Sequence, residues 1–244
     1  FTVDDGYSDC LEVGMPVFGQ LDCPVTSFIV PSVIDQQTWF WWDQIDWIQR
    51  NTTHSSVTIN LGDRSLRIEC ADAVARKRTY AELCERIRSI SNAQLVAVVN
   101  QLSAAAEVSI PDRAPDEYRV ATWDELRSAE SRGARFGAHS MTHPILSRCD
   151  DDQATHEIIG SVQRVRSELK RPSSVFCYPV GCPISFGERE ISIVKRAGML
   201  GALSTSPGTL TQRSVGTADV NWLWRLPRMG YEERQGAMAR IALL

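Results

Sequence analysis

The chain has 244 residues, of which 43% are hydrophobic and 23% are charged, and its net charge is -4 at pH 7. A chain of this length can bury a substantial core, and single α/β barrels often reach this size. The negative net charge and the lack of a basic stripe exclude a typical nucleic-acid-binding surface. No apolar run approaches the roughly 20 residues that span a bilayer, so the sequence predicts no transmembrane segment.

The cysteines and the first residues bear on localisation. Seven cysteines, an odd number, occur without any Cys-x-x-Cys pair. This pattern favours reduced thiols and a cytoplasmic setting. The chain starts inside its first expected strand, so we expect upstream residues to be missing, and export stays an alternative.

The first expected strand leads into Asp4-Asp5-Gly6. Phe1 to Val3 are expected to end a buried strand, and adjacent side chains on a strand point in opposite directions. The two carboxylates can therefore take different roles, one as a metal ligand and the other as a base that accepts a proton from water. Gly6 permits a sharp turn. Asp-Asp-Gly is also common at plain turns, so this segment alone favours a structural role.

The region from about 36 to 118 does not alternate strands with helices. We expect it to be a mostly helical insertion within a single domain that covers residues 1–244. Helices are expected at Thr79 to Ser89 and at Ser91 to Ala106, because apolar residues recur there at helical spacing.

A run of aromatic residues, 39–42, lies near the start of this insertion. Trp41, Ile45 and Ile48 recur at helical spacing, which indicates an apolar helix face that docks the insertion. Aromatic rings also stack on sugar rings. The other tryptophans of the run, above all Trp42, are therefore candidates for lining a cleft and contacting a substrate.

After the insertion, a helix is expected to begin with Thr122 as its N-cap, and Glu125 completes a capping box. Gly133 ends this helix. Residues 134–138 are then expected to form a short strand that leads directly to His139.

His139 and His143 are four residues apart. On one helical turn this spacing places two imidazoles on the same side, where they can bind one ion. Pro144 restricts the residue before it, so the helical turn is expected to end at His143, which fits a short ligand-bearing loop better than a long helix. Two histidines and one carboxylate leave a coordination position open, as in hydrolytic zinc sites.

The rest of the chain alternates helices with strands. We expect a helix at 150–169, a strand at 174–178, a helix at 188–197 and a strand at 202–204. His156 lies inside the first of these helices, so it is expected to be a surface or packing residue. The alternation predicts an α/β fold with parallel strands and with ligands at the carboxyl ends of the strands.

The Asp-Asp-Gly and His segments resemble the first two motifs of the polysaccharide deacetylase family, the NodB-homology domain of the carbohydrate esterases. The resemblance implies that Asp4 is the general base. It also implies that Asp5, His139 and His143 bind one divalent metal ion, with Zn²⁺ expected first and cobalt, nickel or manganese as alternatives. The expected architecture is the family's distorted, incomplete (β/α) barrel.

Residues 176–181, Phe-Cys-Tyr-Pro-Val-Gly, resemble the family's third motif in the variant form Phe-x-Tyr-Pro-x-Gly. The resemblance implies that the backbone N–H of Val180 helps to hold an oxyanion. Tyr178 and Pro179 are candidates for substrate contact. Other members carry an arginine in place of Cys177, so another group must orient the base here.

Residues 226–229, Leu-Pro-Arg-Met, resemble a segment near the end of the same subgroup. Better-known members place a histidine nearby as the general acid, but the four histidines of this chain lie elsewhere. Arg225 or Arg228 supplies positive charge at the site or forms an ordinary ion pair, and neither donates a proton near neutral pH. The general acid is therefore unassigned.

The resemblance implies a metal-dependent hydrolase that removes N-acetyl groups from a polysaccharide or oligosaccharide and releases acetate. One alternative is hydrolysis of another amide or ester on the same fold, such as a formamide, a cyclic ureide or an O-acetyl group. The other is a glycan-binding module with a degraded site, because the third-motif arginine and the late histidine are both missing. The oligomeric state carries no sequence signal.

Overall fold

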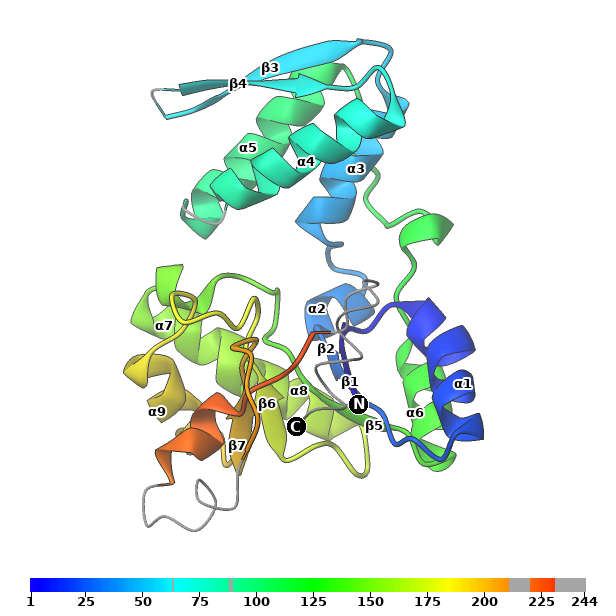
Figure 1. Cartoon of the computed structure of the whole chain (residues 1–244), viewed down its shortest axis with the longest axis vertical. Helices are drawn as coiled ribbons and strands as arrows, with labels where there is room; N and C mark the ends of the chain where they lie inside the picture. Colours follow the sequence, from blue (N-terminus) through cyan, green and yellow to red (C-terminus); the bar gives the residue numbers. More distant parts are fainter. Residues whose placement is uncertain (63, 88–89, 211–219, 231–244) are drawn as a thin grey trace.

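The structure is a computed structural model that describes residues 1–62, 64–87, 90–210 and 220–230. Figure 1 shows parallel strands with flanking helices in its lower part and a layer of helices with a β-hairpin in its upper part. None of the described helices is long and apolar enough to cross a lipid bilayer.

Five short parallel strands form the lower part. β1 (Thr2–Asp5), β2 (Thr26–Ile29) and β5 (Arg135–Ala138) form one sheet in the order β1-β2-β5. β6 (Val175–Cys177) and β7 (Gly201–Leu203) form a second parallel pair. Among the described residues no closed sheet forms, which confirms the predicted distorted, incomplete barrel. The sequence predicted a buried strand here, but β1 is only half-buried. It lies at the edge of its sheet, where, among the described strands, it pairs only with β2.

Helices and short turns surround these strands, and their positions follow the predicted alternation. They are α1 (Met15–Gln20), α2 (Pro31–Ile34), α6 (Trp123–Ser131), α7 (Asp151–Thr155), α8 (Ser161–Glu168) and α9 (Glu188–Arg196), with π-helical turns at Cys10–Gly14 and His156–Gly160 and 3₁₀ turns at Asp116–Tyr118, Leu146–Arg148 and Asn221–Arg225. One hydrophobic cluster joins strands and helices, and its buried members include Leu126, Phe136, Ile158, Phe176 and Val194.

Local sequence signals explain two of these helices. The capping box predicted at Thr122 and Glu125 is present at the start of α6. The helix predicted at 150–169 is one continuous helical stretch, in which a π-helical turn separates α7 from α8. Such turns add a residue to one helical winding and are frequent at functional sites.

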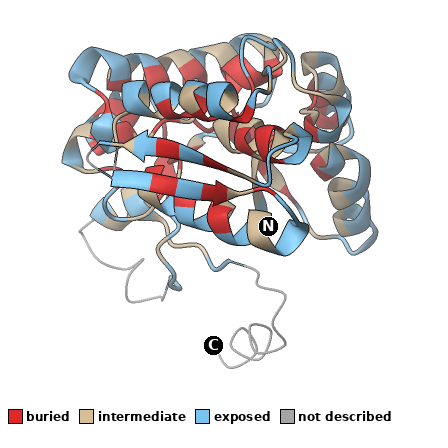
Figure 2. Cartoon of the chain, turned by 90° about the horizontal axis from the view of Figure 1, so that it is seen from above, coloured by how far each residue is buried: buried red, intermediate tan, exposed pale blue. Residues whose placement is uncertain are grey.

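The upper layer contains α3 (Trp41–Asn51), β3 (Ser56–Leu61), β4 (Arg64–Glu69), α4 (Ala73–Ile87) and α5 (Asn92–Ala106). It has its own hydrophobic core, which includes Ile45, Ile48, Ile59, Leu83 and Leu102. The apolar face of α3 therefore packs inside this layer. The antiparallel hairpin of β3 and β4 was not predicted, although its alternating buried and exposed residues are typical of strands (Figure 2). Positions 88 and 89 of the predicted helix lie outside the described residues.

The segment after the last 3₁₀ turn adds to the edge of β7. Leu226 forms a parallel bridge with Leu203. Its N–H donates to the carbonyl of Ala202 at 2.8 Å, and its carbonyl accepts the N–H of Ser204 at 2.9 Å. Arg228 follows two residues later, so this pairing brings its side chain to the carboxyl ends of the strands.

The contact between β5 and β2 leaves no room for a side chain at Gly137. A Cβ there would lie 2.6 Å from a ring carbon of Phe28. We expect Gly137→Ala to lower the free energy of unfolding by about 1–3 kcal/mol, because the packed ring must shift. In α1, a Cβ on Gly19 would meet nothing within 4 Å, so Gly19→Ala should stabilise by up to about 1 kcal/mol. Urea unfolding measures the free energy of unfolding of both variants. An unchanged free energy of unfolding in Gly137→Ala would contradict this packing.

Candidate functional site

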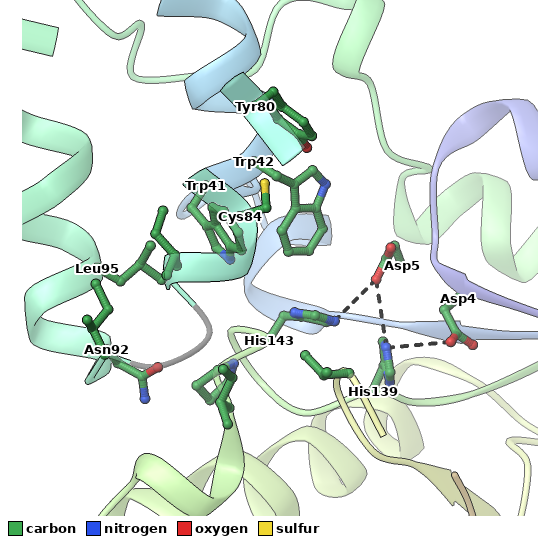
Figure 3. Close-up of a pocket in the computed structure, with 15 residues that line it drawn as sticks. Asp4, Asp5, Trp41, Trp42, Tyr80, Cys84, Asn92, Leu95, His139 and His143 are labelled. Carbon is green, nitrogen blue, oxygen red and sulfur yellow. Dashed lines mark ion pairs between the residues drawn. The ribbon is translucent and has the colours of Figure 1, made fainter. Parts of the chain in front are cut away.

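A cavity of about 380 Å³ opens at the carboxyl ends of β1, β5 and β6. The barrel contributes Asp4, Asp5, His139, His143 and Val180 to its lining. Helices α3, α4 and α5 contribute the opposite side (Figure 3). The residues that the sequence suggested as base, metal ligands and oxyanion donor therefore all border one cavity.

Unusual backbone conformations concentrate in the loops around this cavity. The φ angle is positive at Asp5 (76°), Ser140 (62°), His143 (60°) and Val180 (62°). Residues with side chains rarely adopt such angles, and a β-branched residue there is a genuine outlier. Strain of this kind costs on the order of 1–3 kcal/mol per residue and persists only where the surroundings enforce it. Its concentration here supports a functional role for the cavity.

Both carboxylates of the first motif face the cavity. Strict alternation along β1 would turn one of them away, but the positive φ of Asp5 ends the alternation at the strand terminus. Nε2 of His139 lies 3.9 Å from Oδ2 of Asp4 and 3.8 Å from Oδ1 of Asp5. One imidazole is thus close to both carboxylates.

The segment from His139 to His143 is a short loop, as predicted from Pro144, but it contains no helical turn. The positive φ angles at Ser140 and His143 are incompatible with a helix, and Pro144 disfavours the α region at the residue before it. The N–H of His143 instead donates to Oγ of Ser140 at 3.0 Å. This loop still brings the two imidazole rings together, with their centroids 4.9 Å apart.

A buried carboxylate, Glu157, holds this loop in place. Its Oε2 accepts the N–H groups of Met141 and Thr142 at 2.9 and 2.8 Å, and its Oε1 accepts the hydroxyl of Thr142 at 2.6 Å. Glu157 is only 3% exposed and lies in the π-helical turn between α7 and α8. The sequence analysis did not identify it, because an acidic residue in an amphipathic helix normally faces water.

Asp5, His139 and His143 form a group that can hold a metal ion. Oδ1 of Asp5 lies 3.8 Å from Nε2 of His139 and 3.6 Å from Nε2 of His143. Tetrahedral zinc with bonds of about 2.0–2.2 Å places its donor atoms about 3.3–3.6 Å apart, so these two pairs need at most a small closure. Oδ1 of Asp5 is also buried without a hydrogen-bond partner among the described residues. A bound cation would satisfy this oxygen, and the residues therefore fit a divalent metal ion.

The protonation of these groups also suits a metal ion. Nδ1 of His139 lies 2.8 Å from the carbonyl oxygen of Cys177, and an N–H there leaves the Nε2 lone pair directed at the cavity. Burial and the neighbouring His139 lower the pKa of His143 to about 3, so its imidazole is neutral. Burial raises the pKa of Asp5 to about 6 against the opposing effect of His139. An adjacent cation would favour the ionised carboxylate.

Arg228 binds Asp4 through two parallel hydrogen bonds. Its Nη1 donates to Oδ1 and its Nη2 to Oδ2, both at 2.7 Å. The thiol of Cys177 donates to Oδ1 at 3.6 Å. Burial alone would raise the pKa of Asp4, but His139 and Arg228 outweigh that effect and the pKa is lowered. Arg228 thus supplies the arginine contact that the third motif lacks at position 177.

The loop after β6 presents Val180 to the cavity. Thr205 anchors this loop: its hydroxyl donates to the Val180 carbonyl at 2.8 Å, and its N–H donates to the Gly181 carbonyl at 2.9 Å. Within the described ranges, no protein acceptor takes the N–H of Val180. A preorganised backbone donor of this kind is what an oxyanion needs.

Trp42 packs against one of the candidate ligands. Its ring meets His143 edge to face with a centroid distance of 4.9 Å and stacks on Phe40 at 4.4 Å. Its Nε1 donates to the hydroxyl of Tyr7 at 2.8 Å, and that hydroxyl donates to Asp43 at 2.6 Å. Trp42 lines the cavity, where the sequence analysis proposed a substrate contact.

Two proposed substrate contacts do not line the cavity. Tyr178 is fully buried in the core, where its ring stacks on Phe186 with a centroid distance of 3.8 Å. Pro179 is also buried and is not part of the lining. An aromatic ring at the end of a buried strand is stabilised more by packing in the core than by exposure to water in a cleft. Only Val180 of this segment reaches the cavity.

Arg225 and His156 also lie away from the cavity lining. Nη2 of Arg225 lies 2.9 Å from Oε1 of Glu188 in an exposed ion pair. His156 opens the π-helical turn on the helix behind the loop, as expected for a residue that is not a ligand.

Comparison with protein-family models identifies one family, and solved structures share the fold. The model of the family described as polysaccharide deacetylase matches residues 1–202. The fold is similar to the Streptococcus pyogenes deacetylase PplD in complex with acetate, with 13% identity over 99% of this chain and 67% of that chain and a TM-score of 0.58. No curated protein sequence matches the chain.

Two further solved structures share the fold. The BpsB deacetylase domain from Bordetella bronchiseptica has 14% identity over 93% of this chain and 68% of that chain, with a TM-score of 0.50. A de-N-acetylase from Aggregatibacter actinomycetemcomitans has 13% identity over 98% of this chain and 72% of that chain, with a TM-score of 0.51. At such identities the likeness concerns the fold alone.

The three hydrogen bonds to Glu157 lead to a test of loop positioning. We expect Glu157→Gln to weaken Zn²⁺ binding by about 10–100-fold, because an amide NH₂ replaces one acceptor and the ligand loop loses its anchor. His156→Ala, one residue away on the same turn, should leave the affinity unchanged. Isothermal titration calorimetry with Zn²⁺ measures both affinities. Equal affinities for Glu157→Gln and the parent would show that the loop does not need this carboxylate.

Proposed function

The chain belongs to the polysaccharide deacetylase family, and we propose that it is a metal-dependent hydrolase that removes N-acetyl groups from a polysaccharide or oligosaccharide. The arrangement of two groups in one cavity carries this proposal. One is the metal-binding group of Asp5, His139 and His143 with its unpartnered buried oxygen. The other is Asp4, ionised and held by Arg228.

The three proposed ligands would hold one divalent ion, and Zn²⁺ is the first choice for two imidazoles and a carboxylate. Bound there, the ion supplies Lewis acidity at the scissile carbonyl and makes water a stronger acid. Asp5 and the two histidines keep the Nε2 and Oδ1 atoms directed to one point, and Glu157 fixes the loop that carries both rings.

Asp4 is the proposed general base. Its lowered pKa keeps it ionised at neutral pH, so it can accept a proton from the attacking water. Arg228 fixes both carboxylate oxygens, which sets the direction of proton transfer. Since arginine keeps its own proton near neutral pH, Arg228 is a positioning residue and not the acid.

The remaining steps use the same few groups. The N–H of Val180 is proposed to donate to the oxyanion as the carbonyl carbon becomes tetrahedral. When the carbon–nitrogen bond breaks, the proton that Asp4 took from water passes to the leaving nitrogen. Acetate and a free amine on the sugar are then the products, and no separate acid is required.

The proposal extends to the domain organisation. The single catalytic domain covers residues 1–244, and the layer within about 36–118 is an insertion that walls its cavity. The contact between Arg228 and Asp4 weakens the case for a degraded glycan-binding module, because one of the two missing groups has a substitute.

A substrate panel tests the reaction. With Zn²⁺ present, we expect acetate release from chitooligosaccharides to exceed turnover of N-formyl and O-acetyl analogues, and Asp4→Asn to lower kcat by about 10²–10⁴-fold. Dominant activity on a formamide or an O-acetyl ester would replace the proposed substrate. Zinc binding that His139→Ala abolishes, with no hydrolysis of any substrate, would favour a binding module.

The pair of Asp4 and Arg228 leads to a second prediction. We expect Arg228→Lys to lower kcat by up to about 10²-fold, because one ammonium replaces a two-point contact. Arg228→Met removes the charge that lowers the pKa of Asp4, so the acidic limb of the kcat/KM profile should move to higher pH. Arg225→Lys is the matched control and should keep parent kinetics. An unmoved acidic limb in Arg228→Met would mean that Asp4 is not the titrating base.

A further inference from the structure

The cavity has two chemically different sides. Figure 3 places Asp4, Asp5 and His139 on one side and Trp41, Cys84 and Leu95 on the other. Among the described lining residues, the only carboxylates are the two of the first motif. The side formed by the insertion therefore offers no charge to a ligand.

The insertion side contains an aliphatic part, here called the aliphatic side. Ile87 at the end of α4, Ile90 in the connection and Leu95 in α5 form it, and Ile145 of the barrel lines the same cavity. The rest of the insertion side is lined by Trp41, Trp42, Tyr80, Cys84 and Asn92. The aliphatic side chains cannot satisfy the hydroxyl groups of a sugar, and burying an unpaired hydroxyl costs roughly 1–3 kcal/mol. An apolar group fits the aliphatic side better than a glycan does.

The polar atoms of the insertion side belong to its other residues. The hydroxyl of Tyr80 interacts with the thiol of Cys84, and Nδ2 of Asn92 donates to Sγ of Cys149 at 3.3 Å. The side chains of Ile87, Ile90 and Leu95 carry no polar atom. The aliphatic side therefore has no side-chain group that recognises a polar ligand.

A second cavity of about 360 Å³ adjoins the first. The two cavities share Trp41, Asn92, Leu95, His143 and Pro144. The second has more amide and hydroxyl side chains in its lining, namely Thr38, Gln44, Asn100 and Thr142, beside the rings of Trp39 and Phe40. Aromatic faces together with such groups suit a sugar.

A substrate amide also has two unlike ends, an acyl group and an amino sugar. We propose that the aliphatic side binds an N-acyl chain longer than acetyl, while the amino sugar lies towards the second cavity. This inference rests on the proposed amide hydrolysis at the same site. The site then accepts acetyl as its shortest acyl group and favours amino sugars with acyl chains of several carbons, because an acetyl group fills only a small part of a cavity of about 380 Å³.

An acyl series on one sugar tests the inference. N-acetyl, N-butanoyl and N-hexanoyl chitotriose are hydrolysed by the Zn²⁺-loaded protein, and the released amine is quantified. Each buried methylene is worth about 0.8 kcal/mol, a factor of about four, so kcat/KM for the hexanoyl compound should exceed that for the acetyl compound by at least about tenfold. A series that is flat or that falls with chain length would overturn the inference.

Two variants of one residue locate the effect. Ile90→Phe fills the aliphatic side and Ile90→Ser makes it polar, so both should remove most of the preference for hexanoyl over acetyl. Val74→Phe, at an exposed position of α4 outside the cavity, is the matched control and should keep the preference. Circular dichroism confirms folding. Retained preference in both folded Ile90 variants would contradict the proposed location.

Further measurements distinguish a failure of the proposed acyl pocket from a failure of the proposed reaction. Octyl β-N-acetylglucosaminide carries its apolar chain on the sugar, so a gain for this compound without a gain in the acyl series would assign the pocket to an aglycone and overturn the inference. Binding is followed independently by quenching of tryptophan fluorescence. Affinity that rises with acyl length without hydrolysis would support the pocket and reject the proposed reaction. Acetate release without any chain-length effect would support the proposed reaction and overturn the proposed acyl pocket.

Discussion

The two-point contact between Asp4 and Arg228 is the interaction on which the site depends. It joins the first residues of the described chain to its last described segment, in a barrel that backbone pairing does not close among the described strands. The pair is mostly shielded from water, with 26% and 15% side-chain exposure. Separating it would leave two poorly solvated charges, which is costly in a partly buried site. A contact that fixes the proposed base therefore also holds the β7 edge segment near β1.

The ligand side of the cavity is held in place by hydrogen bonds to strained loops. Its loops adopt strained backbone angles, and buried groups such as Glu157 enforce them through several hydrogen bonds. This preorganisation leaves one carboxylate oxygen of Asp5 buried and unpartnered. The fold thus accepts local instability where a cation can compensate for it, which is a common arrangement at functional sites.

The insertion adds a property that the barrel alone lacks. This layer has its own hydrophobic core, and the side chains that it contributes to the cavity carry no carboxylate. In the proposed function, the barrel residues attack the bond and the insertion contacts the groups next to that bond. The proposal thus assigns chemistry and selectivity to different parts of the chain, as is common where one fold serves several substrates.

Sequence alone determined the family and the α/β class and indicated the residues of the candidate metal-binding group, because these depend on short motifs and on local periodicity, such as the capping box at Thr122. It did not predict the π-helical turn that carries Glu157 or the burial of Tyr178. Those depend on contacts between distant segments. The partner of Asp4 was likewise decided only by the tertiary structure, since 224 positions separate it from Arg228. Local patterns report what neighbouring residues favour, whereas a charge pair between segments so far apart in sequence exists only once the strands between them have folded.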